Sequence, residues 1–272
     1  MSRDFDLALV AAGVGGTRFA GCVRHFPSVA STNTLALEAA QRGERAGVWV
    51  ADEQTAGRGR GGHGWHSARE EGLYVSALIA PRLPASRALW IALASALAVR
   101  RAVGEMSGLD VDIRWPNDLL LGRKKCGGIL VGSALPAAQA SQVDAMRYAV
   151  IGIGLNVAHE SFPPELREQA TSLRLESGHS VGREELLVAL LRALDDELVM
   201  LDEEEEGAVR NGGLLERLAM ASTWVRGKRV RVGEADGYTG VTAGLSAEGF
   251  LRVQADDGTE RIVLSGGVRE RA

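Results

Sequence analysis

The sequence predicts an α+β protein in which a mixed sheet with flanking helices is followed by a small domain of β-strands. Three observations predict this class. Apolar segments of strand length alternate with longer segments of helical periodicity as far as about residue 206. Beyond Trp224, short alternating segments separated by glycine-containing turns take their place. With 272 residues and 46% hydrophobic content, the chain is long enough to bury a core.

The first 27 residues are predicted to be a leader and not a domain. They show little pattern up to Gly16, and a short extended stretch follows around residues 21–26. The polar trio at 31–33, Ser-Thr-Asn, then precedes a run of leucine and alanine, which is typical of a helix start capped by hydroxyl or amide side chains. Residues 47–54, GVWVADEQ, indicate a strand that enters a loop.

The middle of the chain alternates between the two types of structure. Residues 72–80 are apolar and bounded by turn signals, which predicts a buried strand, whereas residues 84–106 are rich in alanine and leucine and predict a helix. Three further strands are predicted in VDIRW, CGGILVGS and RYAVIGIGLNV, with a Pro-Asn-Asp turn after the first. Leucines at helical spacing over 182–206 predict an amphipathic helix. Its acidic end, 202–206, is interpreted as a solvated helix end, with a docking surface for a basic partner as the alternative.

The sequence pattern changes in the last part of the chain. KRVRVGE, YTGVTAGLS, FLRVQA and ERIVLS are short alternating segments, which predict a small β-barrel or meander. We therefore expect three parts: a leader over 1–27, a main domain over 28–221 and a small domain over 222–272. A domain of roughly 50 residues buries too little surface to be stable alone, so it should pack on the larger one.

Composition and charge exclude several classes of protein. The formal net charge of −4 gives no general reason to bind nucleic acid, so an anionic ligand needs a local basic patch. The two cysteines, Cys22 and Cys126, are too few for a disulfide framework or a four-ligand zinc site. Neither a signal-peptide pattern nor an apolar run of about 18 residues is evident, which predicts a cytoplasmic protein without a membrane partner.

The most informative segment is the loop over residues 57–64, GRGRGGHG. Glycines let backbone amides approach an anion closely, and arginine adds a forked, permanently charged donor. The loop therefore indicates binding of a small anion such as phosphate or carboxylate. A flexible surface loop, or an arginine–glycine element that touches RNA, remains the alternative.

Three further segments carry candidate chemistry. Lys125 begins a buried strand and could neutralise a phosphate, although a basic hairpin turn explains the same residues. Residues 115–118, Trp-Pro-Asn-Asp, place a carboxylate in a turn, where it could help to bind Mg²⁺ beside a phosphate. Residues 152–156, GIGLN, end an apolar strand with small residues that could admit a flat ring, and an ordinary strand exit is the alternative.

Taken together, these segments resemble the biotin–protein ligases. The motifs that carry the resemblance are STN at 31–33, DEQTAGRGRGGHGW at 52–65, GLYVS at 72–76, RWPNDLLL at 114–121, KKCGGILV at 124–131, GIGLNV at 152–157 and ATSL at 170–173. The resemblance spans nearly the whole chain from residue 28 onward. The combination of the GRGR loop with the downstream lysine and Gly-Ile-Leu run is highly specific.

The resemblance implies a catalytic domain of the biotin/lipoate ligase type followed by an SH3-like β-barrel. It also implies an ATP-dependent ligase that forms biotinyl-5'-AMP from biotin and ATP, with Mg²⁺. The biotinyl group would pass to a lysine of a biotin carboxyl carrier protein or domain of a carboxylase. A homodimer is left open.

Carried over residue by residue, the resemblance also implies site residues. Catalysis would depend on Lys125, Arg58 and Arg60, and Asp118 would lie by the metal, directly or through water. The biotin-binding residues would be Ser31, Thr32, Asn33, Gln54, Arg58, Gly59, Arg60, Lys125 and Gly128. The ATP-binding residues would be Arg60, Trp65, Asn117, Asp118, Lys125 and Asn156.

The sequence departs from the pattern of the family in two respects, and other functions compete with the one that the resemblance implies. Some relatives carry an N-terminal helix-turn-helix domain, but only about 30 residues precede the STN motif, so no DNA-binding role is expected. Cys126 and Gly127 stand where relatives often have Leu-Ala; Cys126 is interpreted as an inert buried thiol, with a reactive thiol as the alternative. A lipoate or octanoate ligase or transferase is the alternative enzyme, against which the GRGR loop argues. His63 and His66 lack the further ligands of a zinc site.

Overall fold

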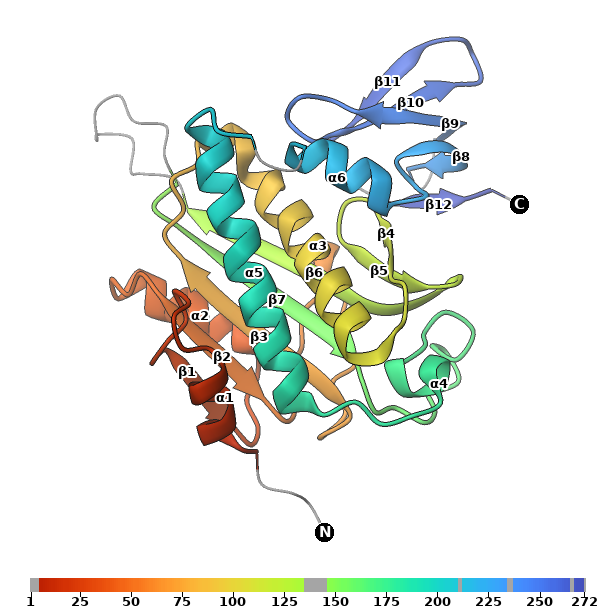
Figure 1. The fold of residues 1–272 in the computed structure, drawn as a ribbon. Helices are drawn as coiled ribbons and strands as arrows, with labels where there is room; N and C mark the ends of the chain where they lie inside the picture. The colour runs from red at the N-terminus through yellow and green to blue at the C-terminus, as the bar shows by residue number, and fades with distance from the viewer. Residues whose placement is uncertain (1–4, 135–145, 210–211, 234–236, 265–266, 272) are drawn as a thin grey trace.

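The fold contains two β-sheets with helices packed around the larger one (Figure 1). A computed structural model describes residues 5–134, 146–209, 212–233, 237–264 and 267–271. The larger sheet is mixed and has seven strands, and the smaller is antiparallel and has five. The predicted α+β class is therefore confirmed.

The larger sheet contains every strand predicted before residue 157, including the extended stretch around 21–26, and one strand that was missed, Asp118–Leu121. Its strands are β1 (Val23–Phe26), β2 (Gly47–Ala51), β3 (Gly72–Ile79), β4 (Asp112–Arg114), β5 (Asp118–Leu121), β6 (Lys124–Ala134) and β7 (Tyr148–Asn156). They lie in the order β1-β2-β3-β7-β6-β5-β4. Strand β1 comes from the predicted leader and pairs in parallel with β2, whereas every other ladder is antiparallel.

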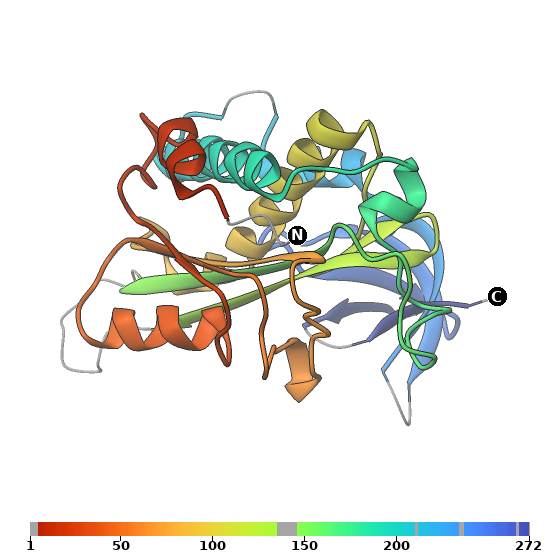
Figure 2. The same cartoon turned by 90° about the horizontal axis from the view of Figure 1, so that it is seen from below.

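Helices cover both faces of this sheet. They are α1 (Leu7–Gly13), α2 (Thr32–Gln41), α3 (Ala88–Ser107), α4 (Leu173–Ser177), α5 (Arg183–Glu205) and α6 (Leu214–Ala221), with single 3₁₀ turns at Arg60–Gly62 and Ala85–Arg87. Figure 2 shows α1, α3 and α5 on one face and α2 on the other. The predicted helices over 84–106 and 182–206 correspond to α3 and α5.

Alternate side chains of β7 point to opposite faces of the sheet and belong to two separate cores. Ile151, Ile153 and Leu155 belong to the large core beneath α3 and α5. Val150, on the opposite face, packs with Ala36 of α2 in a smaller core. The face on the α2 side therefore has little apolar cover beyond the end of that helix, and the candidate site lies there.

The acidic end of α5 is engaged within the chain. Asp202 lies 3.8 Å from Arg18, and Glu206 lies 3.5 Å from Arg82. The Glu204 carboxylate accepts a hydrogen bond of 2.9 Å from the backbone N–H of Leu214. These contacts favour the interpretation as a helix end over that of a docking surface.

The smaller sheet packs against the β4–β5 end of the larger one. Its strands are β8 (Arg226–Val232), β9 (Tyr238–Leu245), β10 (Leu251–Ala255), β11 (Glu260–Val263) and β12 (Val268–Glu270), in the order β11-β10-β9-β8-β12. Trp115 Nε1 donates to the carbonyl of Gly249 at 2.9 Å, and the Ser222 hydroxyl donates to the carbonyl of Ile113 at 2.5 Å. The predicted packing is confirmed. Among the described residues no ladder joins β11 to β12, so closure into a barrel stays a prediction.

Buried His159 makes the stability of the fold depend on pH. It lies just beyond β7, is fully buried, stacks on Phe162 at 4.9 Å between ring centroids, and also contacts His66. Burial, with the neighbouring His66, lowers the pKa of His159 to about 4. Its ring nitrogens lack hydrogen-bond partners among the described residues, and the Glu71 carboxylate lies 3.8 Å away.

We expect the free energy of unfolding to fall as the pH drops from 6.5 towards 4. In this window the unfolded chain binds a proton at His159 that the folded chain does not, so acid favours unfolding, by about 2–3 kcal/mol in all. Denaturant unfolding at pH 7 and at pH 4.5 measures the difference. His159→Phe should remove most of this dependence, and an unchanged dependence in that variant would assign it to other groups.

Candidate functional site

A cleft on the α2 side of the larger sheet has a floor of nearly bare backbone. Gly152 and Gly154 of β7 and Gly128 of β6 line it, and Gly128 lies directly opposite Gly154 in the ladder. Ser76 of β3 lies opposite Gly152. Because glycine has no side chain, a flat group can approach this floor closely. The geometry agrees with the prediction that GIGLN admits a ring.

Polar side chains close one end of the cleft, at the start of α2. Gln54 Oε1 accepts hydrogen bonds from the backbone N–H and the hydroxyl of Thr32 at 2.9 and 3.1 Å. Ser31 occupies the N-cap position with extended backbone, but its hydroxyl makes no capping bond within the described chain. The Ser31 hydroxyl and the Asn33 amide nitrogen are buried without a hydrogen-bond partner among the described residues. Leaving buried polar atoms unpaired costs about 1–3 kcal/mol each, so this end is built to receive a polar ligand.

One residue at this end was missed from the sequence. Ser76 is fully buried and shares a hydrogen bond of 2.9 Å with the Thr32 hydroxyl. A single serine in the otherwise apolar buried strand 72–79 was the available signal. The prediction assigned the whole strand to the core, because Thr32, the partner of Ser76, lies 44 residues earlier in the sequence.

Cationic side chains gather at the other end of the cleft. Arg58, Gly59 and Arg60 line it from the loop after β2, and Lys125 lines it from β6. Arg60 Nη1 donates to Asn117 Oδ1 at 3.1 Å, while the Arg58 guanidinium makes no hydrogen bond or ion pair within the described residues. Two guanidinium groups and one ammonium group in one cleft suit a ligand with more than one anionic group.

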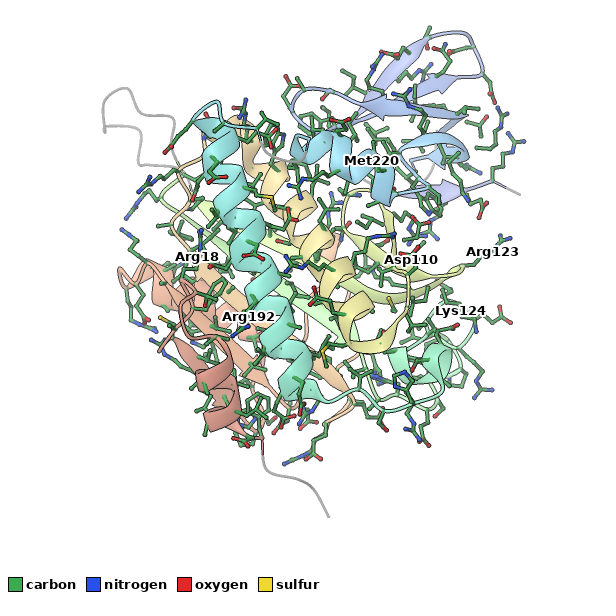
Figure 3. The ribbon with its side chains drawn as sticks, in the orientation of Figure 1. Arg18, Asp110, Arg123, Lys124, Arg192 and Met220 are labelled. Atoms are coloured by element: carbon green, nitrogen blue, oxygen red, sulfur yellow. The ribbon has the colours of Figure 1, made fainter. Side chains whose placement is uncertain are left out.

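The basic segment over residues 123–125 lies partly at a turn and partly in the cleft. Arg123 and Lys124 lie at the exposed β5–β6 turn, at the periphery of the molecule (Figure 3). Lys125 follows at a register shift between the two strands and turns into the cleft. The interpretation as a turn therefore holds for Arg123 and Lys124, and the role of Lys125 towards a phosphate stays a prediction.

Lys125 forms an ion pair with Asp118, which does not itself line the cleft. The second oxygen of that carboxylate accepts two hydrogen bonds from Arg114, at 3.0 and 2.5 Å. Burial alone would raise the pKa of Asp118, but the charges of Lys125 and Arg114 outweigh it and hold the pKa below its usual value. Asp118 is therefore ionised at neutral pH and compensated on both oxygens.

Trp65 partly fills the cleft. Its indole ring lies over the floor, within 3.6 Å of where a Cβ atom would stand on Gly128 and within 2.6 Å of that position on Gly154. The Lys125 ammonium lies 5.4 Å from the ring centroid. Only about 50 Å³ of the cleft is open, whereas pockets for drug-sized ligands enclose roughly 300–1,000 Å³. A ligand that lies on the glycine floor would therefore have to displace the Trp65 ring.

Two other predicted residues do not line the cleft. The Asn156 side chain is buried, and its amide nitrogen donates to the carbonyl of Thr171 at 2.9 Å. It thus ties the ATSL segment to the end of β7, and its contact with a nucleotide stays a prediction. Cys126 faces the core, where burial raises the pKa of its thiol to about 12, which agrees with the inert interpretation.

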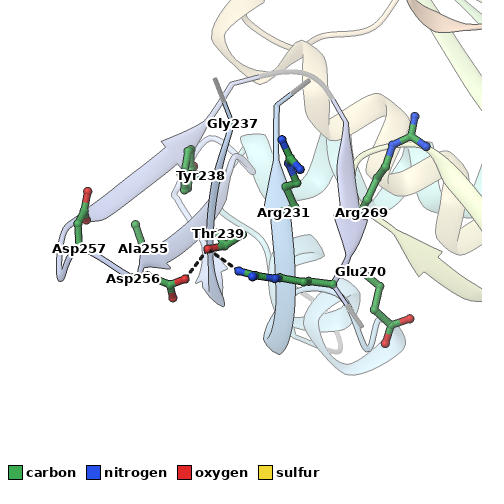
Figure 4. A pocket seen from close by; sticks show the side chains of 10 residues that line it. Arg231, Gly237, Tyr238, Thr239, Ala255, Asp256, Asp257, Arg269 and Glu270 are labelled. Atoms are coloured by element: carbon green, nitrogen blue, oxygen red, sulfur yellow. Dashed lines mark hydrogen bonds between the residues drawn. The ribbon is translucent and has the colours of Figure 1, made fainter. Parts of the chain in front are cut away.

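A second, larger hollow of about 700 Å³ lies on the smaller sheet (Figure 4). Its acidic side chains are already paired: Asp256 with Arg229 at 2.7 Å, and Glu270 with Lys228 at 2.8 Å. Its described lining residues include none of the buried unpaired polar atoms that mark the cleft. The cleft on the larger sheet is therefore the candidate functional site.

Comparison with known proteins assigns the chain to a family. The model of the biotin/lipoate A/B protein ligase family matches residues 25–156. The biotin–[acetyl-CoA-carboxylase] ligase of Paracoccus denitrificans is 32% identical over 241 residues, which cover 85% of this chain and 94% of that protein. The chain belongs to the biotin protein ligases of this family. Its matched segment begins at β1 and ends with β7, so it contains all the residues that line the cleft.

Two further biotin protein ligases extend the likeness. The bifunctional ligase/repressor BirA of Bacillus spizizenii is 32% identical over 238 residues, covering 86% of this chain and 70% of that protein. The biotin protein ligase of Aquifex aeolicus, solved in complex with biotin and ATP, superposes with a TM-score of 0.75 at 26% identity. That match covers 92% of this chain and all of the other, so the likeness includes the smaller sheet.

Proposed function

We propose that this chain forms biotinyl-5'-AMP from biotin and ATP and transfers the biotinyl group to a lysine of a biotin carboxyl carrier protein or domain. The observation that carries the proposal is a single cleft with a glycine floor, unpaired polar atoms at one end and three cations at the other. The relative from Aquifex aeolicus binds biotin and ATP, and the Paracoccus enzyme is named for a carboxylase acceptor. Both names support the same substrates here.

The polar end fits the ureido ring of biotin. A ureido group has one carbonyl acceptor and two N–H donors, and Ser31, Thr32, Asn33 and Gln54 offer hydroxyl and amide partners for all three. Two of those partners are buried and unpaired, so a bound ureido group would satisfy them. Gly59 and Gly128 would leave room for the side chain of biotin on its way to the cations.

The cationic end fits the reacting groups. Biotin carboxylate and the triphosphate repel each other, and Arg58, Arg60 and Lys125 would neutralise both. A carboxylate oxygen of biotin then attacks the α-phosphorus, and pyrophosphate leaves. In the second step the acceptor lysine attacks the acyl carbon, and AMP leaves. A closed loop over residues 57–64 would shield the mixed anhydride from water between the steps.

The nucleotide would lie beyond the cations. Trp65 would pack on the adenine once the ring leaves the glycine floor, and Asn117, which holds Arg60, would lie near the phosphates. The Asn156 amide nitrogen donates to the carbonyl of Thr171, which leaves its amide oxygen as the atom that could accept a hydrogen bond from the nucleotide. The assignments of Trp65 and Asn117 rest on their places in or beside the cleft.

Mg²⁺ enters the proposal as the companion of the ATP phosphates, whose charge it would neutralise. In this arrangement Lys125 and Arg114 are paired with the two oxygens of Asp118, so a direct contact of Asp118 with the metal would need Lys125 to turn away. A contact through water stays a prediction. No group of three or more His, Cys, Asp or Glu side chains in the described part of the chain is arranged to hold a metal ion.

The remaining expectations belong to the same proposal. We retain the division into 1–27, 28–221 and 222–272, although β1 places part of the first segment in the larger sheet. We also retain a cytoplasmic location and leave a homodimer open, with no role for DNA or membrane. Within the described ranges, no helix combines the length and low polarity that a membrane crossing requires.

Calorimetric titration with biotin and, in parallel, with lipoate tests the proposal against the alternative lipoate or octanoate enzyme. We expect biotin to bind and lipoate not to, because lipoate lacks the ureido group that the polar end would pair. Addition of ATP and Mg²⁺ should then yield a product with the mass of biotinyl-5'-AMP. A preference for lipoate, or the absence of an acyl-adenylate, would refute the proposal.

A further inference from the structure

A continuous row of contacts joins Lys125 to the smaller sheet. Its ammonium pairs with one oxygen of Asp118, and the Arg114 guanidinium donates two hydrogen bonds to the other. That guanidinium in turn lies over the ring of Trp224, 5.4 Å from the centroid. Trp224 is buried and lies two residues before β8, so the row begins in the cleft and ends in the small domain.

The smaller sheet holds the far end of this row in place. Lys228 of β8 also lies over the Trp224 ring, at 4.9 Å, and its ammonium pairs with Glu270 of β12 at 2.8 Å. The backbone N–H of Trp224 donates to the Ser222 hydroxyl at 3.1 Å. The ring therefore has a defined position from which it can support the flat guanidinium of Arg114.

This row of contacts bears on catalysis because the Lys125 ammonium has two alternative anionic partners, Asp118 and the proposed substrate. In this structure it neutralises Asp118, and in the proposed reaction it must neutralise the substrate. When it turns away, Asp118 would become a largely buried carboxylate with an anionic substrate close by, unless another cation remained. Arg114 does not line the cleft, so it can stay with Asp118 while Lys125 leaves.

We propose that Arg114 is a positioning residue that frees Lys125 for the reaction, and that Trp224 is the residue through which the small domain takes part in catalysis. The inference rests on the proposed role of Lys125. A merely structural role predicts something different: loss of Arg114 or Trp224 would lower stability and leave turnover unchanged. The domains keep other contacts, such as those from Trp115 to Gly249 and from Ser222 to Ile113, so loss of one stack should not separate them.

The first test compares Arg114→Gln and Arg114→Lys in the full chain. Glutamine keeps a donor but removes the charge, and we expect kcat for pyrophosphate release to fall about 10- to 100-fold. KM for ATP and Kd for biotin should change less than about twofold, because Arg114 touches neither ligand. Arg114→Lys should restore most of kcat, since it returns a cation to Asp118.

The matched control is Arg87→Gln. Arg87 also joins a carboxylate to an indole, since it pairs with Glu205 and lies 4.3 Å from the Trp90 ring centroid, but it does not line the cleft or contact Asp118. Its loss should lower the unfolding temperature without lowering kcat. An equal fall in kcat for Arg87→Gln and Arg114→Gln would mean that stability alone accounts for both, and would overturn the proposal.

The second test asks whether Arg114 and Trp224 act through the same path. Trp224→Leu should lower kcat, Trp224→Phe should restore part of it, and Trp224→Leu combined with Arg114→Gln should be no slower than Arg114→Gln alone. Fully additive losses, or normal kcat in Arg114→Gln, would overturn the proposal and leave the proposed function standing. If Lys125→Ala itself kept normal turnover, the proposed role of Lys125 and this inference would fall together. The absence of a biotinyl-adenylate product from the unsubstituted chain would instead refute the proposed function, so the two failures are distinguishable.

Discussion

Replacing Lys125 with alanine should lower the rate of biotinyl-adenylate formation by about 10²–10³-fold. The lysine supplies the one ammonium group that lines the described cleft. The fold should survive, because Asp118 keeps its two hydrogen bonds from Arg114. Pyrophosphate release at saturating biotin and ATP measures the rate, and thermal unfolding checks the fold.

Lys124→Ala is the control for this result. Lys124 precedes Lys125 in the same strand, but it is exposed and donates to the carbonyl of Arg167 at 3.2 Å, away from the cleft. Its loss should leave pyrophosphate release within about twofold, as is usual for an exposed surface charge. Near-normal release from Lys125→Ala, or equal losses in the two variants, would remove Lys125 from the reaction.

Replacing Gly154 with valine should weaken biotin binding about 10- to 100-fold. The valine methyl groups would occupy the floor on which we propose that biotin lies. In this structure a Cβ atom at position 154 would stand within 2.6 Å of the Trp65 indole. Forcing extra atoms into a filled site costs roughly 1–3 kcal/mol, which corresponds to this range of affinity. Calorimetric titration with biotin measures the change.

Gly132→Val tests whether any glycine in the sheet has this effect. Gly132 lies on β6, four residues beyond Gly128, and a Cβ atom there meets only Leu37, at an ordinary 3.6 Å. Valine also suits a β-strand, so both variants should fold. We expect biotin affinity to be unchanged in this control. Equal affinity in Gly154→Val would show that biotin does not lie on the glycine floor.

Much of the fold followed from local patterns. The leucines of α5 and the apolar run of β3 predicted their elements because each is long and periodic enough to stand out without knowledge of its neighbours. Strands β5 and β12 were missed. They span four and three residues, too few for a pattern, and they exist because neighbouring strands pair with them.

The candidate site, too, was predictable only in part. The sequence by itself determined the chemistry available: Arg58 and Arg60 in a glycine-rich loop, Lys125 at a strand start, and polar side chains before a helix. Each of these is a motif within a few consecutive residues, so it can be recognised without the fold. The resemblance to biotin–protein ligases rested on the same motifs.

Only the tertiary structure decided which side chains meet. It paired Lys125 with Asp118, brought Ser76 beside Thr32, and placed the Asn156 amide on the carbonyl of Thr171, outside the lining of the cleft. It also set Arg114 on Trp224, more than a hundred residues further along the chain. Such contacts depend on strand register and on the packing of one sheet against another, and both arise from burial of apolar surface over the whole chain, which no short segment encodes.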